Sequence, residues 1–292
     1  MDEIDLTEHM EELFAVYKGI LFNSRTFVKD HTAKFAYDFQ CREYRRLSEK
    51  YDLAAASGNG SEFERAVRLM SRFAPRLTHD GMYDNHIACN AEALLEYSLD
   101  DAEHGINCLN KSKILQECCL ALGIFARRVW IYPCSPYDFD NHVVNEVYDL
   151  SRKKWIMLDM TAEGYFADES GTPLSVLETR EKFALDLPCE FIKTGETSAY
   201  FQDEQEEKLY YKTYFAKNLF RLAAEQENRY GIGKHVLNFL PEAFNDVLWE
   251  RMNGAFRARS FYGKNDPRAV FDDAPAPRNK SCDTACLAAA PE

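Results

Sequence analysis

The stretch GINCLNKSKILQECCLALGIFAR, residues 105–127, predicts a buried helix followed by a strand. Apolar side chains recur at helical spacing from Cys108 to Leu122, and Gly123 stands where helices commonly end on a left-handed residue. The run at 126–132 is rich in β-branched and aromatic residues, which favour a strand. We therefore expect an α+β fold in which a helix beginning at Cys108 packs on an antiparallel sheet.

Cys108 is the cysteine that this arrangement makes most reactive. Free backbone N–H groups and the positive end of the helix dipole stabilise a thiolate at the first residue of a helix. Cys118 and Cys119 lie about three turns further along the same helix, where the dipole gives no help and apolar neighbours raise a thiol pKa. Cys108 is therefore the candidate nucleophile.

A predicted hairpin downstream supplies a base and a carboxylate. Strands are expected at 142–148 and 154–159, joined by a turn around Leu150 and Ser151. That register places His142 directly opposite Asp159, Val144 opposite Met157 and Glu146 opposite Trp155. Directly opposed side chains are close enough for a carboxylate to accept the imidazole N–H and fix its tautomer.

Each of these three residues also has an ordinary structural explanation. A cysteine at a helix terminus is more often inert than catalytic, a histidine that begins a strand is usually structural, and an aspartate that ends one is usually a turn or cap residue. Metal binding by Cys108, His142 and Asp159, or by the pair Cys282 and Cys286, is a further reading, but no paired CxxC arrangement of the zinc-site kind is present.

The helix segment and the two strand segments together resemble the transglutaminase-like superfamily, which has a papain-type fold. The shared features are a glycine shortly before the cysteine, the LGIFAR run at 122–127, the histidine strand NHVVNEVY at 141–148, and the strand KWIMLDMT at 154–161. The resemblance is specific over about residues 100 to 165 and is closest to the uncharacterised bacterial branch. It implies Cys108 as nucleophile, His142 as general base and then acid, and Asp159 as the orienting carboxylate.

The chain departs from the family pattern at positions around the triad. Asn110 replaces a common aspartate, Val143 and Val144 replace the usual alanine-tryptophan, and Met160 replaces a common proline. None of these changes removes a catalytic group. The three tryptophans all follow Cys108, so none can take the upstream oxyanion role seen in animal transglutaminases, and the side chain that completes an oxyanion hole stays open.

Composition narrows the class of protein and of partner. The 292 residues are 46% hydrophobic and 13% aromatic, which indicates a packed globular protein. A net charge of -13 argues against nucleic acid or an anionic membrane as the main partner. The acidic N-terminus lacks the pattern of a signal peptide, and nine scattered cysteines fit reduced thiols, so a cytoplasmic location is expected.

Three regions are expected along the chain. Residues 1–60 form a lead-in packed on the core, residues 61–271 form the transglutaminase-like domain with a C-terminal extension, and residues 272–292, rich in Ala, Pro and Asp, form a disordered tail. Ser61 and Glu64 form a capping box that begins a helix after the Ser-Gly-Asn-Gly loop. The role of residues 200–271 stays undefined.

The leading functional hypothesis is a cysteine-dependent acyl-transfer enzyme that hydrolyses a peptide or amide bond through a Cys108 thioester. Transglutaminase-type transfer to an amine on the same triad is one alternative, and a non-enzymatic peptide-binding module that keeps the fold is another. No cofactor is expected, and no calcium loop of the Asp-x-Asp-x-Asp-Gly type is visible. The expected partner is a peptide or protein substrate; the substrate's identity and the oligomeric state stay open.

Overall fold

The structure, a computed structural model, describes residues 9–28, 34–233, 235–245, 271 and 274–275. The tail expected at 272–292 therefore lies outside the described residues, apart from residues 274 and 275.

The described elements are mostly helices up to Ala121 and mostly strands after it. The helices are α1 (Met10–Asn23), α2 (Arg42–Tyr51), α3 (Leu53–Ser57), α4 (Glu62–Phe73), α5 (Ala91–Asp100), α6 (Cys108–Ala121), α7 (Val176–Ala184) and α8 (Glu204–Asn218), with a short 3₁₀ turn at Ala74–Arg76. The strands are β1 (Ala36–Tyr37), β2 (Ala126–Tyr132), β3 (His142–Asp149), β4 (Lys154–Leu158), β5 (Gly164–Asp168), β6 (Cys189–Lys193), β7 (Arg221–Glu225), β8 (Glu227–Asn228) and β9 (Val236–Phe239).

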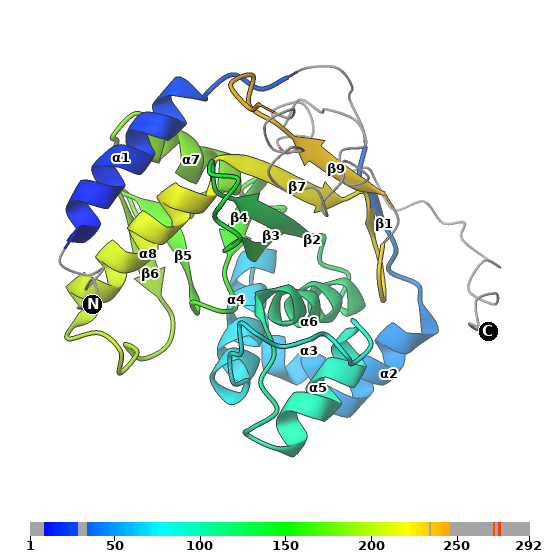
Figure 1. Cartoon of the computed structure of the whole chain (residues 1–292). Helices are drawn as coiled ribbons and strands as arrows, with labels where there is room; N and C mark the ends of the chain where they lie inside the picture. Colours follow the sequence, from blue (N-terminus) through cyan, green and yellow to red (C-terminus); the bar gives the residue numbers. More distant parts are fainter. Residues whose placement is uncertain (1–8, 29–33, 234, 246–270, 272–273, 276–292) are drawn as a thin grey trace.

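A five-stranded antiparallel sheet in the order β4-β3-β2-β7-β9 divides the molecule into two layers. Helices α2 to α6 gather on one side of this sheet, and α1, α7 and α8 lie on the other side (Figure 1). Each side has its own apolar core, one including Val129, Val144 and Phe215 and the other including Leu115, Val147 and Ile156. Alternate residues of β3 face opposite cores because side chains alternate across a strand. The predicted α+β fold is confirmed.

Helix α6 begins at Cys108, as the sequence predicts. Its N-cap is Asn107, whose side-chain oxygen accepts a hydrogen bond from the backbone N–H of Asn110. The helix ends at Ala121, one residue before the predicted Leu122, and Gly123 then adopts a left-handed φ of 73°. Almost all of the helix is buried between α2, α4, α5 and the sheet, so α6 packs on the antiparallel sheet as expected.

Side chains cap the starts of helices α4 and α5. Ser61 and Glu64 make the predicted capping box at the start of α4. Helix α5 begins at Ala91, because the Asn90 side chain caps it by accepting from the backbone N–H of Ala93.

The predicted register of the β3–β4 hairpin is wrong by two residues. Glu146, not Val144, lies opposite Met157, and Tyr148, not Glu146, lies opposite Trp155. The cause is the connection, which has four residues and begins after Asp149, where the carboxylate accepts the backbone N–H of Arg152. A shift of two residues keeps every side chain on its predicted face.

The lead-in is built from helices that contact both layers. Helix α1 packs on α7 and α8, whereas α2 packs on α6. The aromatic segment at 210–220 falls largely in α8, and Phe215 is fully buried in the core beside the sheet. Helices from the N-terminal lead-in therefore pack on both sides of the sheet.

Candidate active site

Cys108 occupies the first turn of α6, at the end of the helix nearest β3. Its side chain is half-buried, unlike Cys118 and Cys119, which are fully buried in the same helix. Because the Asn107 cap is used by the N–H of Asn110, the N–H of Cys108 is one of the first-turn donors that have no acceptor within the helix. It is therefore available to bind negative charge on a substrate oxygen.

Residue Asn110, which replaces the common aspartate of the family, anchors the approach to α6. Its amide donates to the side-chain oxygen of Asn85 at 2.9 Å, and the amide of Asn107 donates to the same oxygen at 3.2 Å. Asn85 itself has a φ of 59°, a left-handed conformation that asparagine tolerates better than most residues. These amides fix the loop at 85 against the start of the helix.

His142 and Asp159 meet in spite of the shifted register. His142 Nε2 and Asp159 Oδ2 are 2.7 Å apart, and both side chains are almost completely buried. In the observed register these residues are diagonal neighbours, a separation that an imidazole ring can bridge. The contact expected from the sequence is present, but as a diagonal pair and not a directly opposed one.

The second carboxylate oxygen of Asp159 is held by the backbone. Oδ1 accepts the N–H of Thr161 at 2.8 Å and the N–H of Ala162 at 3.2 Å. Burial alone would raise the pKa of Asp159, but attraction to His142 and these hydrogen bonds lower it below its usual range. Asp159 is therefore ionised and fixed in orientation.

The Cys108 thiol lies close enough to the side chain of His142 to influence its titration. Burial alone would lower the pKa of His142, but Asp159 and then Cys108 raise it well above its usual value. The structure thus brings all three residues together, in the order thiol, imidazole, carboxylate. The raised pKa of His142 favours the protonated imidazolium beside the thiol.

Aromatic rings from α8 hold the imidazole in place. The ring of Tyr214 lies edge-on to His142 with centroids 5.5 Å apart, and that of Phe215 lies at 5.9 Å. The Tyr214 hydroxyl donates to Asp140 Oδ1 at 3.1 Å, and Lys217 contacts the other Asp140 oxygen at 2.7 Å. The loop that leads into His142 is therefore tied to α8, a segment whose role could not be read from the sequence.

Two further titratable side chains lie near the triad and were missed by sequence reasoning. His79 is exposed and belongs to a segment that bridges to Ile106, the residue before the N-cap of α6. It lies within electrostatic reach of His142 and Asp159, and partial enclosure lowers its pKa. Lys111 is buried one turn after Cys108. Its spacing of three residues from Cys108 was a usable signal, because such residues share a helix face.

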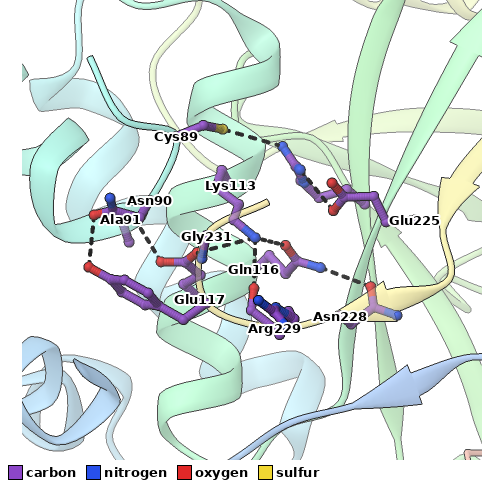
Figure 2. A network of polar contacts seen from close by, with 12 residues as sticks. Cys89, Asn90, Ala91, Lys113, Gln116, Glu117, Glu225, Asn228, Arg229 and Gly231 are labelled. Atoms are coloured by element: carbon purple, nitrogen blue, oxygen red, sulfur yellow. Dashed lines mark hydrogen bonds and ion pairs between the residues drawn. The ribbon is translucent and has the colours of Figure 1, made fainter. Parts of the chain in front are cut away.

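A separate buried network anchors the middle of α6 (Figure 2). Lys113 Nζ lies 3.1 Å from Glu117 Oε1 and donates to Gln116 Oε1 at 3.0 Å and to the carbonyl of Arg229 at 2.8 Å. Glu117 in turn accepts the backbone N–H of Ala91 at 2.7 Å. Helix α6 is thereby fixed to α5 and to the chain after β8.

A buried arginine supports the first turn of α6 from the sheet. Arg128 NH1 donates to the carbonyl of Leu109 at 3.2 Å, and Arg128 NH2 contacts Glu225 Oε2 at 2.8 Å. NH1 also lies 3.9 Å from the sulfur of Cys89. The residue next to the nucleophile is thus held by β2 and β7.

Two negative findings apply to the described part of the chain. Within it, no group of three or more His, Cys, Asp or Glu side chains is arranged to hold a metal ion. No helix among the same residues has the length and apolar character needed to cross a bilayer. The tail pair Cys282 and Cys286 lies outside the described residues.

Comparison with known proteins agrees with the resemblance seen in the sequence. Residues 49–160 match the model of the transglutaminase-like superfamily, a segment that contains Cys108, His142 and Asp159 and begins within the predicted lead-in. No curated protein matches the chain. A crystal structure from Cytophaga hutchinsonii, named as a proposed cysteine protease, is 14% identical with a TM-score of 0.31.

That match covers 61% of this chain and 59% of the other, so the chain spans less than two thirds of that protein's length. What the family match supports in general is a cysteine-dependent enzyme. The match over residues 49–160 bears out the resemblance to the transglutaminase-like superfamily that the sequence predicts.

Proposed function

We propose that the chain hydrolyses a peptide or amide bond through a thioester on Cys108, with His142 and Asp159 as its catalytic partners. One observation carries the proposal. His142 Nε2 lies 2.7 Å from Asp159 Oδ2, and the Cys108 thiol is near enough to the same imidazole to help raise its pKa. A nucleophile, a base and an orienting group in contact are the minimum that covalent acyl transfer requires.

In the acylation step the Cys108 thiolate attacks the carbonyl carbon of the scissile amide. The C=O π electrons move onto oxygen, and the resulting oxyanion is placed to accept the N–H of Cys108. The tetrahedral intermediate then collapses, the C–N bond breaks, and His142 gives its proton to the leaving amine. Asp159 keeps the imidazole in the required orientation throughout.

In the deacylation step water replaces the amine. Neutral His142 takes a proton from water, the hydroxide formed attacks the thioester, and the C–S bond breaks to release a carboxylic acid and the Cys108 thiolate. Water, at about 55 M, is the acceptor of the acyl group unless the site excludes it and orients an amine, since such positioning is worth several kcal/mol. Among the described residues near His142 we see no site that would bind and orient an acceptor amine, and for this reason we propose hydrolysis.

A peptide library tests the proposal directly. The protein is incubated with diverse peptides, with and without a labelled primary amine, beside Cys108→Ala and the control Cys134→Ala, which removes an exposed thiol. New peptide ends without amine incorporation are expected for wild type and Cys134→Ala, and none for Cys108→Ala.

The other outcomes contradict the proposal in different ways. Incorporation of the amine at glutamine in place of cleavage would identify a cross-linking enzyme on the same triad. Peptide retention without any chemistry, equal in Cys108→Ala and wild type, would identify a binding module.

A further inference from the structure

Lys111 is a buried cation placed one helical turn after the nucleophile. It is the fourth residue of α6, so it lies on the same face as Cys108, and helical side chains lean toward the N-terminus of their helix. The lysine is only 3% exposed. Its backbone N–H donates to the carbonyl of Asn107, but its side chain makes no hydrogen bond or ion pair with any residue of the described part of the chain. A buried ammonium without such a partner carries a cost in stability, which calls for an explanation.

Five charged or titratable groups from different parts of the chain face Lys111. Three of these groups attract the Lys111 ammonium. The other two lie on β6 and on the segment before α5. In order of influence the attracting groups are Glu163 in the turn between β4 and β5, Asp159 at the end of β4, and Cys108 on α6 itself; Lys193 on β6 repels it, and His79 lies within its field.

The strongest of these partners is itself constrained. Glu163 has a left-handed φ of 56°, and its backbone carbonyl accepts both the N–H and the hydroxyl of Thr194. Its carboxylate is half-buried and feels Lys193 before Lys111. Because it forms no hydrogen bond with Lys111, it does not neutralise that ammonium locally, and the field of Lys111 extends to the sulfur of Cys108.

We propose that the Lys111 ammonium stabilises the Cys108 thiolate by charge, as a positioning residue that acts through Cys108 and does not touch the substrate. This inference rests on the proposed role of Cys108 as nucleophile. Lys111 would repel the imidazolium of His142, but the carboxylate of Asp159 offsets this repulsion. The stabilisation of the Cys108 thiolate by Lys111 is therefore kept.

The protonation of Lys111 fits this role. Burial lowers the pKa of Lys111 to about 8, with Glu163, Asp159 and Cys108 opposing the shift. The side chain is thus charged in acid and at neutral pH and loses its charge as the pH rises through about 8. Its influence on Cys108 is therefore complete on the acidic side of neutrality, where the thiolate needs help most.

Alkylation kinetics test the inference without any knowledge of the substrate. The rate of Cys108 modification by iodoacetamide is followed by peptide mass spectrometry between pH 4 and 9 in wild type, Lys111→Met and Lys111→Arg. Loss of the charge in Lys111→Met is expected to move the acidic limb of the profile up by about one pH unit, so that alkylation at a given acidic pH slows about tenfold. Lys111→Arg is expected to keep the wild-type limb.

The experiment includes a matched control variant and a check, within the same measurement, that each variant is folded. Lys154→Met removes the same charge from the far end of β4, where Lys154 pairs with Glu178 at the surface, and is expected to leave the profile unchanged. Protection of the fully buried Cys118 and Cys119 from alkylation shows that each variant is folded. Should Lys111→Met unfold, Lys111→Gln takes its place with the same expected shift.

Two results would overturn the inference. One is a Lys111→Met profile that superimposes on wild type while Cys118 and Cys119 stay protected. The other is a Lys111→Arg profile shifted as far as that of Lys111→Met, which would mean that packing and not charge is responsible. Because alkylation reports the Cys108 thiolate whether or not the protein cleaves peptides, this inference and the proposed hydrolysis can fail separately.

Discussion

Helix α6 carries two buried polar clusters that differ in how completely their members are paired. In the middle of the helix, Lys113 has a carboxylate, an amide oxygen and a carbonyl within reach, and Glu117 accepts two backbone N–H groups besides the lysine (Figure 2). At the start of the helix, Cys108 is half-buried near His142, and the side chain of Lys111 makes no hydrogen bond or ion pair among the described residues.

The difference separates a structural role from a chemical one. Burial lowers the pKa of Lys113 and raises that of Glu117, so the fully paired cluster is still costly to charge and gives little net stability. In the triad, attraction overcomes burial, because the pKa of His142 is raised and that of Asp159 is lowered. A buried charge alone therefore does not indicate catalysis. A buried charge whose side chain lacks hydrogen-bond partners, next to a partly exposed candidate nucleophile, is the stronger indication.

The largest expected effect is on turnover at the triad. Asp159→Asn keeps the size of the side chain but removes the charge that orients His142, so cleavage of a substrate peptide is expected to fall by about 10²–10⁴-fold. Asp149→Asn is the control, since Asp149 is a buried aspartate at the opposite end of the same hairpin. Steady-state cleavage rates decide it, and equal losses in the two variants would remove Asp159 from the catalytic unit.

The next effect is on stability at the structural cluster. Lys113→Met leaves Glu117 buried without its cation and is expected to lower the free energy of unfolding by about 3–5 kcal/mol. Lys154→Met, which breaks a surface pair, is expected to cost under about 1 kcal/mol. Urea denaturation measures both, and a cost for Lys113→Met as small as that of the control would show that the network is not an anchor.

The smallest effect is a pH dependence confined to the triad pair. Because the pKa of Asp159 is lowered from 3.8, its stabilisation is present above pH 3.8 and is lost as the pH falls through the folded value. Because the pKa of His142 is raised from 6.5, its stabilisation is present below pH 6.5 and is lost as the pH rises through the folded value.

The stability difference between wild type and Asp159→Asn should therefore be greatest between about pH 4 and 6.5 and shrink on the alkaline side. For Asp149→Asn it should be level above about pH 5, since the pKa of Asp149 is lowered to about 2. Denaturation across the pH range measures both, and parallel curves for the two variants would contradict the coupling of Asp159 to His142.

The sequence predicts the fold well where local signals and periodicity agree. The cap at Ser61, the strand at 126–132 and the left-handed Gly123 all depend on neighbouring residues alone. The meeting of His142 with Asp159 was also accessible, because a register error of an even number of residues leaves both side chains on the same face.

What the sequence does not contain is the packing of distant segments around the triad. The turn after Asp149 is longer than a simple hairpin rule suggests, which moved the register. Tyr214 comes from a helix 72 residues beyond His142, and His79 from a bridge to Ile106; neither carries a local mark of its position. The helical spacing of Lys111 from Cys108 can be read from the sequence, but the burial of its side chain cannot.

The most direct test of the central account is the order in which the cysteines react. The native protein is treated with limiting iodoacetamide at about pH 6, where an ordinary thiol with a pKa near 8.5 is almost fully protonated, and each cysteine is quantified by peptide mass spectrometry. The account predicts that Cys108 is modified well ahead of every other cysteine and that its lead disappears in His142→Ala. Modification of Cys134 or Cys118 before Cys108, or a lead that survives the loss of His142, would contradict it.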